Sequence, residues 1–240
     1  MYYIKLVFNE IFYRPLLNGL VFFTAVLPGR DLGLAVILLT LIIKIVTFPL
    51  THKMLHTQKK MKAIEPEMKK IYAQNQNKEK QAEAMMALYR AHGVSPFSGF
   101  FALLIQMPLL IALYQVFWKG IPFPGSEIYS FIAVPETVNT LFLGFIQLTE
   151  PSVGLAALSA VSQYFQAKLA MPPGNAAAKR DGDNTQRVLQ FQMTYFFPIL
   201  IFFIAFKLPA AVSLYWTAMN VFAIIHEAVV RKQAASDGKQ

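Results

Sequence analysis

The sequence contains no cysteine and few charged residues. Among its 240 residues only 15% are charged, whereas soluble domains average about 25%. Without cysteine, the chain has no disulfide, no thiol nucleophile and no cysteine-based metal site. Hydrophobic residues make up 55% of the chain, and the mean hydropathy is +0.43. This composition is typical of a membrane protein and leaves the redox compartment open.

Several motifs of common enzyme classes are also missing. The sequence has no Gly-rich phosphate loop, no G-x-S-x-G motif and no pair of carboxylates inside an apolar run. His52 and His56 have the i,i+4 spacing of metal ligands, but no third ligand is evident, and a solvated pair is the simpler interpretation. We therefore expect no enzymatic activity, no metal and no cofactor.

The N-terminus lacks the features of a cleaved targeting segment. It has neither the basic, apolar and cleavable order of a signal peptide nor the Arg- and Ser-rich character of a transit peptide. The net charge of +9 would indicate nucleic acid in a soluble protein. Beside apolar runs it is better explained by cytoplasmic loops and anionic lipid head groups. We expect a bacterial inner membrane location, lipid contact and no specific nucleic acid.

Five apolar runs are expected to cross the membrane as helices. A span needs about 20 residues, and the candidate spans are 32–51, 99–118, 152–171, 188–206 and 210–230. Pro108 and Pro198 lie inside the second and fourth runs, where proline is expected to kink or loosen a helix. The predicted fold class is therefore an all-α membrane protein with five transmembrane helices.

The orientation follows from the positive charges of the connecting segments. The segments 52–98, 172–187 and 231–240 carry nine, three and three Lys or Arg residues. The alternate segments 1–31, 119–151 and 207–209 carry three, one and one. Because positive residues stay on the cytoplasmic side, we expect an extracytoplasmic N-terminus and a cytoplasmic C-terminus.

The first segment contains an apolar piece that is short for a span. We expect residues 10–28 to form an amphipathic helix at the membrane interface. The alternative is a tilted additional span.

The long basic segment 52–98 is predicted to be a cytoplasmic helical hairpin. Glu65-Pro66 suits a helix start and residues 75–77 suit a turn. Apolar residues recur at helical spacing in both halves and predict a methionine-lined seam: Met61, Ile64, Met68 and Ile71, then Met85, Leu88 and Tyr89. The alternative is a solvated charged loop. Met61, Met68, Met85 and Met86 are the expected contacts with a substrate or the ribosome.

Lys44 is the one charged residue within the first run. A central Lys costs roughly 2.5–3.5 kcal/mol on translocon scales. It lies roughly 13 Å below Lys53 along a helix axis, which is too deep for its side chain alone to reach the interface. We therefore expect water to enter partway from the cytoplasmic side.

Polar residues form stripes along three of the runs. The shared helix faces are Thr40, Lys44, Thr47 and Thr51; Ser159, Ser162, Gln163 and Gln166; and Ser213, Trp216, Thr217 and Asn220, with Gln106 in the second run. Such residues commonly join helices, at about 0.6 kcal/mol for each hydrogen bond. An unpaired Lys44 favours a hydrophilic groove instead. The expected lining is Thr40, Lys44, Thr47, Gln106, Ser162, Gln163, Gln166, Trp216 and Asn220.

Three stretches resemble one known family. They are TLIIKIVTFPLT at 40–51, MMALYRAHGVSPFSGFFALLIQMPLLIALYQVF at 85–117 and LPAAVSLYWTAMN at 208–220. Together they are similar to the membrane protein insertases of the YidC/Oxa1/Alb3 family. The resemblance extends over residues 10–232 and implies a five-helix core, a cytoplasmic hairpin and a groove open to the cytoplasm and the lipid.

The resemblance also implies roles for particular residues. The family's groove carries a positive residue, usually Arg, where this chain has Lys44, and Thr40 matches a family threonine one turn earlier. Lys keeps the charge without the bidentate geometry of Arg. Tyr215 and Trp216 match an aromatic pair associated with substrate contact. The long basic ribosome-binding tail of some relatives is missing.

The resemblance implies insertion and chaperoning of nascent membrane proteins by a monomer, with the ribosome and the Sec translocon as possible partners. The alternative is a small ion or solute transporter that uses Lys44 as a titrating site. Transporters often carry acidic residues at the midplane and repeated broken helices, and the sequence shows neither.

Overall fold

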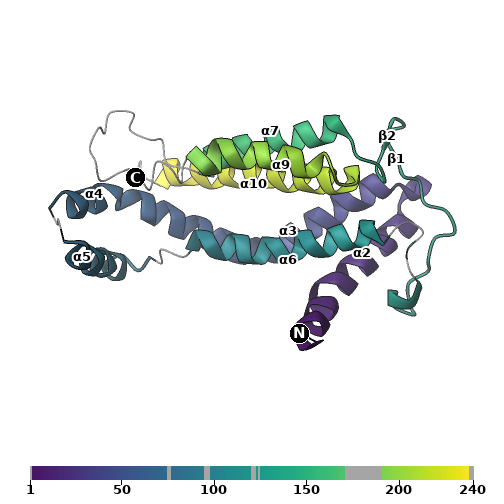
Figure 1. The fold of residues 1–240 in the computed structure, drawn as a ribbon, viewed down its shortest axis with the longest axis horizontal. Coiled ribbons are helices and arrows are strands. Elements are labelled where there is room, and N and C mark those ends of the chain that lie inside the picture. The colour runs from purple at the N-terminus through teal and green to yellow at the C-terminus, as the bar shows by residue number, and fades with distance from the viewer. Residues whose placement is uncertain are drawn as a thin grey trace.

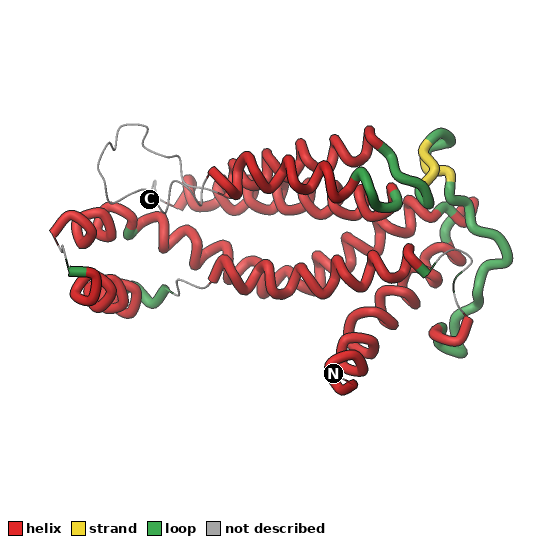
Figure 2. The backbone as a smooth tube through the Cα atoms, viewed as in Figure 1, coloured by secondary structure: helices red, strands yellow, loops and turns green. Residues whose placement is uncertain are grey.

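The computed structural model describes residues 2–74, 77–94, 98–119, 123, 125–170 and 191–237. This part of the chain is almost entirely helical (Figures 1 and 2). Its elements are α1 (Tyr2–Phe8), η1 (Asn9–Tyr13), α2 (Arg14–Val26), η2 (Pro28–Arg30), α3 (Leu32–Ala63), α4 (Glu65–Gln74), α5 (Lys78–Ala91), α6 (Ser98–Trp118), η3 (Gly125–Glu127), β1 (Leu141–Phe142), β2 (Ile146–Gln147), α7 (Val153–Ala170), η4 (Gln192–Phe196), α9 (Phe197–Ala205) and α10 (Ala210–Asp237). The predicted cytoplasmic loop 172–187 lies outside the described residues.

Two of the described helices are long and apolar enough to cross a membrane. These stretches are Leu32–Met54 within α3 and Ala210–Val230 within α10. Gln106–Trp118 and Thr194–Ala205 are shorter apolar helices. The five-span arrangement therefore stays a prediction for the other three runs.

The helix α3 continues past the predicted end of the first span. It runs from Leu32 to Ala63, with Pro49 inside it. Residues 52–63 include Lys, Met, Leu, Gln and Ala, which are good helix formers, and contain no glycine or proline. At 1.5 Å per residue its 32 residues extend about 48 Å, well beyond a hydrocarbon core of about 30 Å.

The helices pack as two groups joined by α10. Figure 1 shows α7, α9 and α10 along one side and α3 with α6 along the other, while α10 also contacts α3. At one end, buried apolar residues of α2, α3, α6 and α10 form a shared core that includes Leu17, Leu20, Val36, Leu113 and Val212. This core fixes how α3 and α10 begin relative to each other.

The N-terminal helix is longer than predicted. The elements α1, η1 and α2 follow one another from Tyr2 to Val26, whereas residues 10–28 were expected. One face, with Tyr13, Leu16 and Leu20, is buried against the bundle. Its first turns expose large apolar side chains, which are Tyr3, Ile4, Leu6, Val7 and Ile11. Its place at a membrane interface stays a prediction.

The hairpin formed by α4 and α5 is held together by an apolar seam. Ile64, Met68, Met85 and Val94 are buried in one cluster, and Met61, Ile71, Leu88 and Tyr89 pack against it. All seven residues of the predicted seam therefore lie together. Burial, with a smaller contribution from the charge of Tyr72, raises the pKa of Tyr89.

A small β-hairpin lies where α3 and α10 begin. β1 and β2 are antiparallel, with Leu141 opposite Gln147 and Phe142 opposite Ile146. The ring of Phe142 occupies the space next to Gly33 in the first turn of α3. This close approach requires a residue without a side chain at position 33.

The substitution Gly33→Ala is expected to destabilise the fold. The added Cβ would collide with the buried Phe142 ring, and such overpacking costs about 1–3 kcal/mol. Thermal unfolding in detergent measures the effect. Gly154→Ala is the matched control, because its Cβ would have its nearest neighbour, Ser152 Oγ, at 3.9 Å. Equal melting temperatures for the two variants would contradict this packing.

Candidate functional site

Lys44 lies on α3 with its side chain half-buried. The ion pairs found among the described residues do not include it. The structure therefore places a half-buried cation within an apolar stretch, without an ion pair among the described residues.

The threonine hydroxyls next to Lys44 bond within their own helix. Thr40 Oγ1 donates to the Val36 carbonyl at 2.7 Å, and Thr47 Oγ1 donates to the Ile43 carbonyl at 2.8 Å. Thr40 is buried and Thr47 is half-buried. Intrahelical bonding satisfies a hydroxyl without a partner helix, so Thr47 is the threonine that remains accessible beside Lys44.

The buried residues of the polar stripes join α7 to α10. Asn220 Nδ2 donates to Ser162 Oγ at 3.1 Å and lies 3.4 Å from the Ser159 carbonyl. Ser162 and Asn220 are only 6% and 5% exposed. This differs from the expectation that both line the groove, because each satisfies the other across the helix contact. At this position the polar residues form a hydrogen bond between two helices, which was the alternative to a groove lining.

Three other residues of the polar stripes remain accessible. Trp216 Nε1 donates to Gln163 Oε1 at 3.3 Å, and Gln163 Nε2 donates to Gln166 Oε1 at 3.1 Å. All three side chains are half-buried. Amides that bond mainly to one another keep donors and acceptors for an incoming segment, so these residues fit a polar path better than Ser162 and Asn220 do.

Tyr215 is buried, unlike its neighbour Trp216. It is 2% exposed, and its hydroxyl accepts a hydrogen bond of 3.2 Å from Gln106 Nε2 of α6. The same amide nitrogen lies 2.9 Å from Met219 Sδ. This pair links α6 to α10. Trp216 is therefore the accessible member of the aromatic pair, whereas Tyr215 with Gln106 positions the helix that carries it.

Three histidines meet where α3 passes α10. His56 Nε2 lies 3.1 Å from His52 Nε2, and His52 Nδ1 lies 3.3 Å from His226 Nε2. The sequence indicated the first pair but not its neighbour on α10, 174 residues from His52. Among the described residues, no group of three or more His, Cys, Asp or Glu side chains has a geometry that could hold a metal ion.

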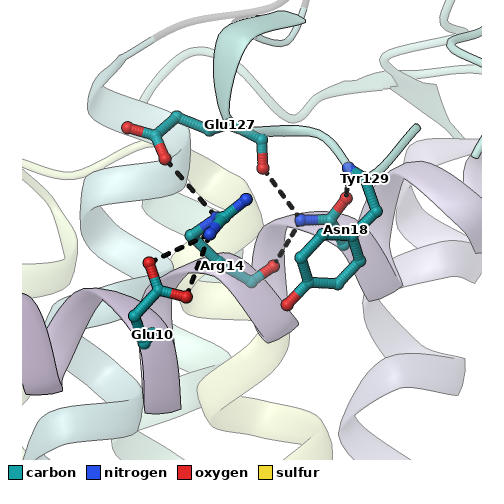
Figure 3. Close-up of polar contacts among 5 residues, drawn as sticks. All are labelled: Glu10, Arg14, Asn18, Glu127 and Tyr129. Atoms are coloured by element: carbon teal, nitrogen blue, oxygen red, sulfur yellow. Dashed lines mark hydrogen bonds and ion pairs between the residues drawn. The ribbon is translucent and has the colours of Figure 1, made fainter.

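A second polar cluster, which the sequence did not reveal, docks the N-terminal helix (Figure 3). Arg14 Nη1 lies 2.9 Å from both carboxylate oxygens of Glu10, and Arg14 Nε lies 3.7 Å from Glu127 Oε2. The hydrogen bond to Glu10 raises the pKa of Arg14, against a smaller lowering by desolvation. Asn18 bonds to the backbone at Glu127 and Tyr129. This cluster holds the loop after α6 on the N-terminal helix.

The four predicted hairpin methionines differ in accessibility. Met68 and Met85 are buried in the seam, Met61 is half-buried, and Met86 is exposed. A flexible thioether suits contact with varied apolar segments. Met86 is therefore the methionine of this set that is placed for contact without opening the hairpin.

Comparisons with known proteins agree over most of the chain. The family model of the 60Kd inner membrane protein matches residues 22–237. Membrane protein insertase YidC 2 of Bacillus anthracis is 33% identical over 224 residues, which cover 91% of this chain and 78% of the relative. Membrane protein insertase MisCA of Bacillus subtilis is 33% identical over 221 residues, with 90% and 76% covered.

A solved structure has a similar fold. The crystal structure of an active YidC insertase, with the first transmembrane domain resolved, matches with a TM-score of 0.58 at 24% identity. The match covers 95% of this chain and 49% of that chain. This chain therefore spans about half the length of the solved insertase.

Proposed function

Because the chain belongs to the YidC/Oxa1 family of membrane protein insertases, we propose that it inserts nascent membrane proteins along a positively charged path beside Lys44. Relatives named as insertases match over about nine-tenths of the chain, and the chain is a membrane protein insertase of the bacterial inner membrane. The observation that carries the path is Lys44, a half-buried cation without an ion pair among the described residues.

In this proposal five helical segments cross the membrane, namely α3, α6, α7, the η4–α9 segment and α10. The N-terminus lies on the extracytoplasmic side, and the α4–α5 hairpin lies in the cytoplasm with the C-terminus. The path opens to the cytoplasm and to lipid. The N-terminal helix lies at the extracytoplasmic interface, where its exposed apolar side chains contact acyl chains.

The electrostatic step acts on the polar part of the substrate. An acidic extracytoplasmic segment is attracted to Lys44, and this attraction exceeds its value in bulk water because the surroundings are partly apolar. Gln163 and Gln166 offer hydrogen bonds that replace part of the lost hydration. The polar segment then has a shorter apolar distance to cross.

The apolar part of the substrate supplies the driving force. A nascent helix first contacts the α4–α5 hairpin through Met86 and then passes Trp216 into lipid. Transfer of about 20 apolar residues from water into the bilayer is favourable without nucleotide hydrolysis. We propose that a monomer suffices and that the ribosome and the Sec translocon are its partners when a substrate is delivered during synthesis. No observation favours the transporter alternative.

Photocrosslinking to a ribosome-bound nascent membrane protein tests this path while leaving Lys44 in place. We expect crosslinks from a photoreactive residue at position 163, 166 or 216. Ile199 of α9 is the matched control, because it is exposed on an apolar helix away from the polar stripes. Equal yields from position 199 and from the three path positions would contradict a defined path.

A further inference from the structure

The turn between β1 and β2 presents two large apolar side chains outward. Leu143 and Phe145 are 65% and 73% exposed. Leu143 has φ 54° and Gly144 has φ 80°. The left-handed region is disfavoured for a residue with a side chain such as Leu, and it persists where the surrounding structure determines it.

The base of this hairpin is fixed to the starts of both candidate spans. The backbone of Asn139 donates to Arg30 and accepts from Leu32, at 3.0 and 2.9 Å. On the other side, the Leu148 carbonyl accepts from Ala211 and the Glu150 carbonyl accepts from Ala210, at 3.0 and 2.8 Å. Leu32–Met54 and Ala210–Val230 are the two stretches long enough to cross a membrane. The hairpin is therefore held beside the starts of both stretches (Figure 1).

The hairpin carries no charge that would keep it in water. Between Glu136 and Glu150 the chain has no charged residue. The backbone amides of Gly144 and Phe145 donate to Leu141 and Phe142 within the turn, at 3.4 and 3.3 Å. Because the amide groups at the tip have partners, approach to an apolar phase leaves few polar groups unsatisfied.

We propose that Leu143 and Phe145 insert into the boundary between head groups and acyl chains, so that the β1–β2 hairpin is a lipid anchor. Lipid fits better than a protein partner because a specific interface needs about 800 Å² on each side, far more than two side chains supply. Large apolar side chains in the first turns of α3 and α7, Leu34 and Val153, are also exposed. The anchor holds the starts of α3 and α10 at a constant depth.

This inference rests on the membrane location of the chain and not on the path beside Lys44. The absence of cysteine makes its test direct, because single cysteines can be introduced without other changes. Leu143→Cys and Phe145→Cys are each labelled with a nitroxide in liposomes of phosphatidylethanolamine and phosphatidylglycerol. Glu136→Cys is the water-exposed reference, and Ile199→Cys on α9 is the apolar reference.

The readout is the collision rate of the nitroxide with oxygen, which concentrates in acyl chains, and with a water-soluble nickel chelate. The anchor predicts that nickel access at 143 and 145 falls at least twofold below that at 136, with oxygen access close to that at 199. Nickel access equal to that at 136 would overturn the anchor. Low access to both reagents would also overturn it, because it indicates burial against protein. Both substituted positions are exposed, so the label displaces no packed side chain, and either position alone decides the result.

Discussion

Replacing Lys44 by Glu is expected to reduce insertion of substrates with acidic translocated segments by at least about tenfold, since only about 1.4 kcal/mol is needed for that factor. The substitution turns attraction into repulsion at a half-buried position. Two unit charges 4 Å apart interact by about 4 kcal/mol at an effective dielectric constant of 20. Protease protection of the translocated segment in proteoliposomes measures the yield.

Two further variants separate charge from geometry at this position. Lys44→Arg is expected to keep insertion close to the original level, because the attraction requires a positive charge and no bidentate contact. Lys44→Met is expected to fall between Arg and Glu. Full activity of Lys44→Glu on acidic substrates would contradict a role for the charge.

The substitution Asn18→Leu is expected to destabilise the fold by up to about 2–6 kcal/mol, because it leaves two part-buried backbone groups without a partner, at about 1–3 kcal/mol each. Asn18 is 2% exposed. Its amide donates to the Glu127 carbonyl at 3.0 Å and accepts from the Tyr129 amide at 2.7 Å (Figure 3). Leu has the same number of side-chain heavy atoms and the same branching as Asn but satisfies neither group. Thermal unfolding in detergent measures the loss.

Glu10→Gln provides the control for Asn18→Leu within the same cluster. Glu10 is exposed and pairs with Arg14 one helical turn away. Exposed pairs of this kind contribute about 0.3–0.5 kcal/mol, so the melting temperature should change little. A similar shift for both variants would contradict a larger contribution from Asn18 than from the Glu10–Arg14 pair.

Local patterns in the sequence predicted those features that depend on neighbouring residues. The membrane class follows from composition, and the methionine seam follows from helical spacing within residues 61–89. The end of the first helix was less predictable. The sequence analysis ended the membrane span at residue 51 and did not predict that the same helix continues to Ala63, although the chain between them contains no glycine or proline.

Features that depend on distant residues could not be predicted. A polar stripe shows that one helix face is unusual, but it does not say whether that face meets another helix or an accessible surface. Ser162 and Asn220 satisfy each other, 58 residues apart, whereas Gln163 and Trp216 on the neighbouring positions remain half-buried. The family resemblance implied the same role, substrate contact, for Tyr215 and Trp216. In the structure Tyr215 is buried and Trp216 is half-buried.

Two long-range polar contacts were missed for the same reason. His226 reaches His52 only because α10 packs beside α3. Arg14 reaches Glu127 only because the loop after α6 returns to the N-terminal helix. In each case the residues carry no local signal beyond a charge or a ring. A sequence-based search for pairs of polar residues near the same predicted membrane boundary would have included both.

The most direct test of the charged path exchanges charges between the insertase and its substrate. Insertion is measured in proteoliposomes for Lys44 and Lys44→Glu, each with a substrate whose translocated segment is acidic and with the same substrate made basic. We expect Lys44→Glu to insert the acidic substrate less well, and the basic substrate better, than the original protein does. The ratio of acidic to basic insertion should change at least tenfold, which corresponds to a coupling energy of about 1.4 kcal/mol. Equal ratios of acidic to basic insertion in both proteins would contradict it.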